Sequence, residues 1–314
     1  MQSPESRSPG VLPLGDAAVR LESASVTRIV HTSDLHFGRP SVSEQIDSME
    51  ESVRELTPDA IAVSGDLTQR CSVPEFEQAR NYLDRMREIA PVLVIPGNHD
   101  IRWLGAVARN LGLFGLHAHE FKYSRYFRYI SGDLSPTLEV PGAVIAGINT
   151  AHGISRGSLT RRFRDLGVIG HVKRRDVEEV AKAFEKADPD AARIVMIHHN
   201  PVKGERTGRH GLANTKEALR SFSELGAELV LCGHDHQEAI HTLESLEETA
   251  PGLVISTAGT ISNRVRAGRP SSFNLVETGD SALSITTYFW EAGGFRPSKS
   301  QEFQRTTASG HTGR

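Results

Sequence analysis

The 314-residue chain has 38% hydrophobic and 6% aromatic side chains and a formal net charge of −3. This near-neutral charge argues against a protein that binds long nucleic acids along its surface, and its two cysteines, far apart in the chain, argue against a disulfide framework. No apolar run is long enough to form an integral membrane segment and no apolar signal core opens the chain, so we expect a cytoplasmic protein.

Composition also indicates where the folded part begins and ends. Residues 1–25 are rich in Ser and Pro, and residues 296–314 are polar. Such segments at chain ends are commonly poorly ordered, so we expect a flexible N-terminal arm and a polar C-terminal tail. We expect residues 26–295 to form one domain, because the motifs of a single site are spread over both halves of this range.

Strands and helices alternate through the first part of this domain. Apolar, β-branched runs predict strands at 28–32, 60–64 and 92–95. Helical spacing of the apolar residues predicts helices at 42–56 and 74–89. Each of the three strands ends directly before a group of polar residues, so the strand ends are where the chemistry is expected.

The rest of the domain contains more strands than helices. Residues 101–128 are expected to hold a helix and an irregular segment. Further strands are expected at 143–148, 193–197, 228–231, 253–257, 273–276 and 282–289, and further helices at 173–186 and 214–222. Because the last strands have no helices between them, a layered α/β sandwich fits better than a doubly wound sheet.

Five polar motifs follow the carboxyl ends of predicted strands. They are Asp34-Leu35-His36, Gly65-Asp66, Gly97-Asn98-His99-Asp100, His198-His199 and Gly233-His234-Asp235-His236. Ligands of open α/β sheets bind beyond the carboxyl ends of the strands, so these five motifs are expected to converge on one cleft.

The residue types in these motifs indicate a metal site. Carboxylate and amide oxygens suit hard divalent cations, and imidazole suits borderline transition metals. The candidate ligands are Asp34, His36, Asp66, Asn98, His198, His234 and His236. Seven ligands are too many for one tetrahedral ion but suit two ions that share a carboxylate, and Asp66, alone at its strand end, is the candidate bridge.

At these motifs the chain resembles the calcineurin-like metallophosphoesterase superfamily. The Asp-x-His, Gly-Asp, Gly-Asn-His-Asp, His and Gly-His-x-His motifs of that family are all present, between about residues 26 and 260. The resemblance implies an α/β fold in which a β-sandwich is flanked by helices in four layers, α/β/β/α. It also implies two divalent metal ions, which are Mn, Fe, Zn or a mixture.

The resemblance further implies how the ligands are shared. One ion takes Asp34, His36, Asp66 and His236, and the other takes Asp66, Asn98, His198 and His234. The fourth motif often reads His-His-Pro-Pro in the family, whereas here it reads His198-His199-Asn200-Pro201. We assign the first histidine as the ligand, and the choice between His198 and His199 stays open.

The catalytic residues also follow from the resemblance. His99, next to the candidate ligand Asn98, corresponds to the family's catalytic histidine, which stabilises the transition state or gives a proton to the leaving oxygen. Asp100 is expected to orient the ring of His99. Attack on the phosphorus would come in line from a hydroxide that bridges the two ions.

Within the superfamily, the segment 64–68 and the paired histidines resemble the class III cyclic-nucleotide phosphodiesterase branch. We therefore expect a hydrolase for small phosphodiesters such as cyclic nucleotides. The alternatives are a phosphomonoesterase or a UDP-diacylglucosamine-type pyrophosphatase, for which residues 103–127 would supply an apolar lid. The loop 203–211 would be a substrate flap. A non-catalytic scaffold of this fold would lack some ligands, and none is missing; the oligomeric state has no sequence signal.

Overall fold

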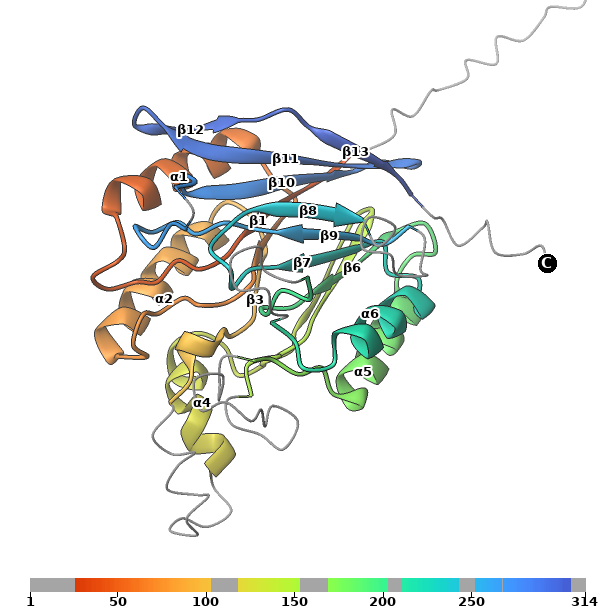
Figure 1. Ribbon diagram of the computed structural model, residues 1–314, viewed down its shortest axis with the longest axis horizontal. Coiled ribbons are helices and arrows are strands. Elements are labelled where there is room, and N and C mark those ends of the chain that lie inside the picture. The colour runs from red at the N-terminus through yellow and green to blue at the C-terminus, as the bar shows by residue number, and fades with distance from the viewer. Residues whose placement is uncertain are drawn as a thin grey trace, which may run out of the picture.

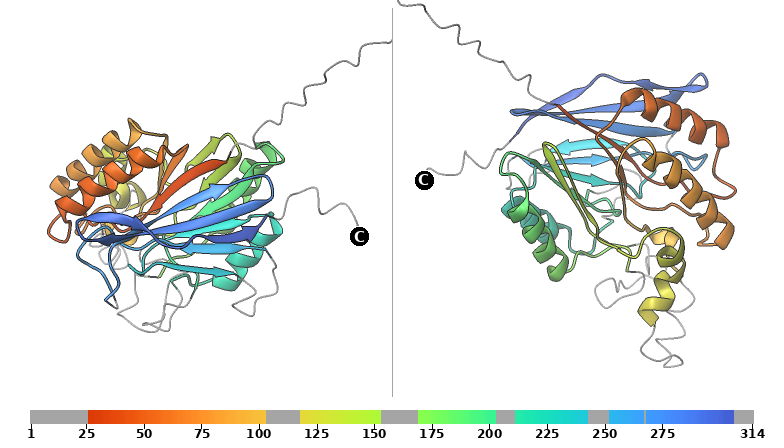
Figure 2. Two further views of the ribbon diagram at one scale, coloured as in Figure 1. Left: turned by 90° about the horizontal axis from the view of Figure 1, so that it is seen from above. Right: turned by 180° about the vertical axis from the view of Figure 1, so that it is seen from behind.

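The computed structural model describes residues 26–102, 118–152, 169–202, 211–242, 252–266 and 268–305. These residues form two β-sheets that pack face to face, with helices on the outer face of each sheet (Figures 1 and 2). The four-layer α/β/β/α sandwich expected from the sequence is therefore confirmed. No helix in the described part of the chain is both long enough and apolar enough to cross a membrane.

The first sheet carries the first two strands of the chain in its interior and the third at one edge. Its seven strands are β1 (Thr27–Thr32), β2 (Ala60–Val63), β3 (Val92–Val94), β10 (Ser272–Thr278), β11 (Ala282–Glu291), β12 (Gly294–Pro297) and β13 (Gln301–Gln304). They lie in the order β12-β11-β10-β1-β2-β3, and β13 also pairs with β11. Strands β1, β2 and β3 are parallel, so the segments that follow them all leave the sheet at the same end of the strands.

The second sheet repeats this parallel arrangement. Its six strands are β4 (Thr137–Val140), β5 (Ala143–Gly147), β6 (Ala192–Met196), β7 (Leu229–Cys232), β8 (Ala239–Thr242) and β9 (Val254–Thr257). They lie in the order β4-β5-β6-β7-β9-β8, and β5, β6, β7 and β9 are parallel. The carboxyl ends of β6 and β7 therefore also lie side by side at the same end of their sheet.

The helices divide between the two outer faces. Helices α1 (Ser43–Leu56) and α2 (Val73–Arg87) cover the first sheet, and α5 (Arg174–Lys186) and α6 (Thr215–Glu224) cover the second (Figure 2). Helix α4 (Ala118–Tyr129) packs against α2. Helix α2 begins where the backbone N–H of Ser72 donates to the Glu75 carboxylate over 3.1 Å, as in a capping box.

Alternation of side chains along the strands builds three apolar layers. In β1, Ile29 faces the layer between the two sheets, whereas its neighbour Val30 faces α1 and α2. In β6, Ile194 faces the layer between the sheets and Val195 faces α5 and α6. Both faces of these strands are buried, which explains why they read as continuous apolar runs.

The C-terminal boundary differs from the expected one. The expected tail begins at residue 296, which lies inside β12, and residues Gln301–Gln304 form β13 and pair with β11. These strands lie on the outer side of the sheet and each carries one apolar anchor, Phe295 or Phe303, so their composition resembles that of a tail. Most of the expected lid, 103–117, and most of the expected flap, 203–210, lie outside the described residues.

Candidate metal centre

The five motifs meet where the carboxyl ends of the parallel strands of both sheets come together. Backbone hydrogen bonds join neighbouring motifs within each sheet: Asp34 N–H donates to the Gly65 carbonyl and Gly233 N–H to the His198 carbonyl, both over 3.0 Å. Across the sheets, His198 Nδ1 donates to the carbonyl of Ser64 over 2.7 Å. The fold thus brings together motif residues that are 200 positions apart or slightly more, such as His234 and Asp34.

Five of the seven candidate ligands have left-handed backbone conformations. The φ angles are 56° at Asp34, 47° at His36, 51° at Asp66, 76° at His234 and 56° at His236. A residue with a Cβ atom rarely adopts this conformation, which costs of order 1–3 kcal/mol and persists where the surroundings impose it. The strained turns aim these side chains into the space between the strand ends, and such strain is common at functional sites.

Two motif glycines are required by close packing. A Cβ atom at Gly97 would lie 2.2 Å from both the backbone N and Oδ1 of Asp66. A Cβ atom at Gly233 would lie 1.9 Å from Ser33 Oγ and 2.6 Å from Asp34 Oδ2. The glycines therefore let the second and third motifs, and the first and fifth, approach within contact distance.

One group of candidate ligands surrounds a carboxylate oxygen that has no hydrogen-bond donor. The ligating atoms of Asp34, His36, Asp66 and His236 all lie within 4.8 Å of one another, and all four residues are buried. Asp34 Oδ1 lies 3.2 Å from His236 Nε2 but accepts no hydrogen bond. His236 Nδ1 donates to the Arg264 carbonyl over 3.0 Å, so Nε2 is the ring nitrogen that faces Asp34. A buried anionic oxygen beside an imidazole nitrogen is suited to a cation.

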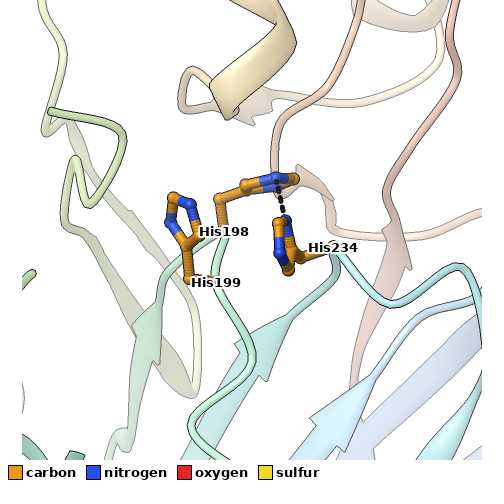
Figure 3. Close-up of side chains that lie close together, drawn as sticks. All are labelled: His198, His199 and His234. Atoms are coloured by element: carbon orange, nitrogen blue, oxygen red, sulfur yellow. Dashed lines mark hydrogen bonds between the residues drawn. The ribbon is translucent and has the colours of Figure 1, made fainter. Parts of the chain in front are cut away.

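A second group lies beside the first. Asn98 Oδ1 is 3.1 Å from His198 Nε2 and 3.0 Å from His234 Nδ1. Figure 3 shows His198 and His234 directed toward each other, with their ring nitrogens 3.4 Å apart. Because His198 Nδ1 donates to a carbonyl, its Nε2 is the ring nitrogen on this side, and it would offer a lone pair to an ion that replaced its proton. These nitrogens and the amide oxygen converge on one point.

The carboxylate of Asp66 lies between the two groups. Its Oδ2 is 3.8 Å from His36 Nε2 in the first group, and its Oδ1 is 3.4 Å from His198 Nε2 in the second. Oδ1 also accepts a hydrogen bond of 2.8 Å from the backbone N–H of His99, which fixes the carboxylate. A carboxylate with one oxygen toward each group is placed to bridge two ions.

His199 is placed differently from His198. Its Nδ1 lies 2.8 Å from Thr150 Oγ1, and its ring lies beside that of His234, with centroids 4.7 Å apart (Figure 3). The ligating atoms of His198, His199 and His234 lie within 4.8 Å of one another, but His198 is the one that contacts Asp66. The geometry therefore favours His198, in keeping with the assignment made from the sequence.

The electrostatics of the site suit cation binding. Burial would raise the pKa of Asp66, but the positive charge of nearby His198 holds that pKa well below its usual value. The pKa of Asp34 is likewise held well below its usual value by His236, against the effect of burial. Burial lowers the pKa of His234 to about 3, whereas Asp66 outweighs burial and raises the pKa of His198 to about 9. A bound ion would take the place of the proton on His198.

His99 lies at the edge of the first group. Its Nδ1 donates to the Gln69 carbonyl over 2.8 Å, and its ring meets that of His36 edge-on, with centroids 4.9 Å apart. Its Nε2 is therefore the ring nitrogen that faces the site, where Arg264 Nη1 lies 3.4 Å away.

Asp100 has a different role from the expected one. Its carboxylate accepts hydrogen bonds from the backbone N–H groups of Gly97, Leu67 and Thr68, at 2.9, 3.1 and 2.8 Å, and from the Thr68 hydroxyl. It has no hydrogen bond to the His99 ring, which the Gln69 carbonyl orients instead. The expectation that Asp100 orients His99 is therefore corrected: Asp100 ties the second motif to the third.

Residue Arg264 was not singled out from the sequence. Its Nη1 lies 3.4 Å from His99 Nε2 and 3.4 Å from His36 Nε2. It lies in the loop after β9, a further parallel strand whose carboxyl end faces the site. The strand-end rule would have pointed to this loop if it had been applied to β9 as well.

The donor set fits two divalent cations. Two anionic carboxylates, one amide oxygen and four imidazoles converge, and the carbonyls of Ser64 and Arg264 hold the rings of His198 and His236 with Nε2 inward. The unpaired oxygen of Asp34 is the kind of buried atom that a cation would satisfy.

Comparison with known proteins agrees with this geometry. A family described as calcineurin-like phosphoesterase matches residues 27–238. A glycerophosphodiester phosphodiesterase, GpdQ of Enterobacter lignolyticus (strain SCF1), is 33% identical over 229 residues, which cover 66% of this chain and 70% of that protein.

Solved structures share the fold at low sequence identity. A purple acid phosphatase from yellow lupin (Lupinus luteus) seeds superposes with a TM-score of 0.62 at 12% identity, over 90% of this chain and 54% of that one. The chain thus spans about half the length of the lupin protein. A dimetal phosphatase from Danio rerio superposes with a TM-score of 0.59 at 9% identity, over 89% of this chain and 99% of that one.

Proposed function

Since the chain belongs to the calcineurin-like phosphoesterase family of dinuclear metal-dependent hydrolases, we propose that it is a phosphodiesterase for small phosphodiesters. The observation that carries this proposal is the Asp66 carboxylate, which presents one oxygen to each of two ligand groups. The glycerophosphodiester phosphodiesterase relative supports small diesters as the substrate class. The motifs that resemble the class III branch support cyclic nucleotides among them.

The ligands would be divided as the motifs imply. Asp34, His36, Asp66 and His236 would hold one ion, and Asp66, Asn98, His198 and His234 the other. The mixture of oxygen and imidazole donors suits Mn, Fe or Zn. When bound, two such ions supply positive charge for the phosphoryl oxygens and an activated water for in-line attack.

The residues of the chain would perform the remaining work. The Gln69 carbonyl holds His99 with Nε2 toward the site, where a protonated Nε2 would give its proton to the leaving oxygen. The backbone N–H of His99 also holds Asp66 in place, so the proton donor and the bridging carboxylate are coupled. Preorganised groups of this kind contribute to catalysis without reorganisation during the reaction.

The site also argues for a single catalytic domain. The first, second and third motifs follow β1, β2 and β3 of one sheet, whereas the fourth and fifth follow β6 and β7 of the other. Neither sheet alone would contain a complete set of ligands. We therefore propose that both sheets form one domain, which includes β12 and β13.

A comparison of substrates tests this function. Protein reconstituted with Mn would be assayed on bis(p-nitrophenyl) phosphate, p-nitrophenyl phosphate, glycerophosphocholine, cyclic AMP and a lipid-linked diphosphate, with the Asp66→Asn variant as the background. We expect kcat/KM to be at least tenfold higher for a diester than for the monoester. A monoester or the diphosphate as the best substrate would contradict the proposal.

A further inference from the structure

The loop that carries Arg264 is fixed against the metal-ligand motifs. Thr260 Oγ1 donates to the Asp34 carbonyl over 2.6 Å, and Asn263 N–H donates to the Pro40 carbonyl over 2.9 Å. The carbonyl of Arg264 accepts the hydrogen bond of 3.0 Å from His236 Nδ1. The backbone at residue 264 is therefore held in place by contacts on both sides, and the side chain starts from a defined position.

The guanidinium of Arg264 makes its polar contacts with the side chains of Gln69, His36 and His99. Its Nη1 lies 3.1 Å from Gln69 Oε1 and 3.4 Å from a ring nitrogen of both His36 and His99. Among the residues that the structure describes, no carboxylate lies within ion-pairing distance of Arg264, although the negative charges of Asp66 and Asp34 act on it and the side chain is half-buried. A guanidinium is suited to planar, anionic oxygen partners, and here that partner is not supplied by the protein.

Other arginines of the same loop have acidic neighbours. Arg269 forms an ion pair with Glu238, and the positive charge of Arg266 acts on Asp235. The acidic residues whose charges act on Arg264 are instead the candidate ligands Asp66 and Asp34, and its Nη1 contacts the rings of His36 and His99. The guanidinium beside the candidate ligands is thus a feature of position 264 and not of the loop as a whole.

We propose that Arg264 binds a non-bridging oxygen of the substrate phosphoryl group, beside His99. The identification of the anion as a phosphoester rests on the proposed function. Nη1 of Arg264 lies 3.4 Å from a ring nitrogen of His36 and 3.4 Å from Nε2 of His99. A phosphoryl group that contacted both an ion bound by His36 and Nε2 of His99 would therefore come within hydrogen-bonding reach of Nη1. Gln69 holds the guanidinium in this position before the substrate arrives.

Removal of the Arg264 side chain leaves the histidine ligand in place. The group that orients His236 is the backbone carbonyl of residue 264, which every substitution retains. Metal content and thermal stability are therefore expected to stay at wild-type levels in Arg264→Gln and Arg264→Lys. The matched control is Arg266→Gln, which removes the same charge from the same loop two residues away.

Binding of inorganic phosphate to the Mn-loaded proteins tests the proposal by calorimetry. We expect Arg264→Gln to weaken phosphate binding by about tenfold or more, Arg264→Lys to give an intermediate loss, and Arg266→Gln to stay within about twofold. With bis(p-nitrophenyl) phosphate, KM would rise and kcat would fall in Arg264→Gln. Equal phosphate affinity in Arg264→Gln and wild type, an equal loss in Arg266→Gln, or loss of metal from Arg264→Gln would each overturn the proposal.

Phosphate binding also separates this inference from the proposed function. If the wild type binds phosphate through Arg264 but hydrolyses no diester, the proposed function fails and the inference stands. If the wild type hydrolyses diesters and the variant binds phosphate normally, the inference fails and the function stands.

Discussion

The Nδ1 atom of His99 donates a hydrogen bond of 2.8 Å to the main-chain carbonyl of Gln69. Because a carbonyl can only accept, this bond fixes which ring nitrogen carries the structural proton. The opposite nitrogen, Nε2, is left to exchange a proton with a substrate. The hydrogen bond at Nδ1 is thus made with the backbone, while the side chains of Arg264 and His36 contact the rest of the ring.

The first prediction concerns His99 itself. In His99→Ala we expect kcat on a phosphodiester to fall by about 10²–10⁴, because a positioned proton donor typically contributes this factor. Metal content should remain as in the wild type, because the ring belongs to neither ligand group. Steady-state kinetics and elemental analysis of the same preparation check both parts. Turnover that is unchanged would remove His99 from the mechanism.

Substitution of Asp100 is expected to lower the stability of the fold more directly than the rate of the reaction. Its carboxylate satisfies three backbone N–H groups and one hydroxyl, and unpaired buried donors cost about 1–3 kcal/mol each. Asp100→Ala should therefore lower the free energy of unfolding by several kcal/mol. Asp84→Ala, which removes an exposed ion pair with Arg87, should cost less than about 1 kcal/mol. Similar urea midpoints for the two variants would contradict the structural role of Asp100.

Asp66→Asn tests the bridging position. The amide keeps the shape of the side chain but removes the negative charge that faces both ligand groups. We expect metal content after Mn reconstitution to fall, and turnover to fall by orders of magnitude. Inductively coupled plasma analysis beside kinetics gives both values. A variant with full metal content and full activity would show that Asp66 does not bridge.

Gly97→Ala tests the close approach of the second and third motifs. The added methyl would lie 2.2 Å from the backbone N and Oδ1 of Asp66, so the motifs must separate. We expect lower thermal stability and weaker metal binding. Gly132→Ala is the matched control, because a Cβ atom there has no neighbour within 4 Å. Equal melting temperatures for the two variants would contradict the packing argument.

The two cysteines should be inert in the folded protein. Burial raises the pKa of both Cys71 and Cys232 to about 12, and the nearby Asp100 carboxylate adds to the effect at Cys71. The reactive thiolate increases as pH rises toward the pKa, so at pH 8 it is only about 1 in 10⁴ of each thiol. Ellman's reagent at pH 8 should detect less than about 0.1 thiol per native chain and two after denaturation. Rapid reaction of a native thiol would contradict this.

Strands that are buried on both faces could be predicted from the sequence, because their residues form continuous apolar runs. The ends of β1, β2 and β3 fall within about two residues of the expected positions. The short strand β8 was not expected, because its residues are only half-buried and show no alternation. The edge strand β13 was read as part of a tail for the same reason.

The candidate site could be predicted in part. The seven candidate ligands lie together because each follows a buried strand, and that relation is visible in a linear pattern. Arg264 was missed because an arginine in a loop that contains other arginines has no distinguishing spacing. The hydrogen-bond partners of Asp100 could not be predicted from the sequence either, because they are backbone N–H groups that only the folded chain brings together.

The left-handed turns at the candidate ligands have a consequence for evolution in the laboratory. Glycine would relieve the conformational penalty at each of these five positions, so selection for heat resistance alone would favour replacing them. Every such gain would delete a side chain of the candidate ligand set. Thermostable descendants of this enzyme obtained without an activity screen are therefore expected to lose catalysis first at these turns.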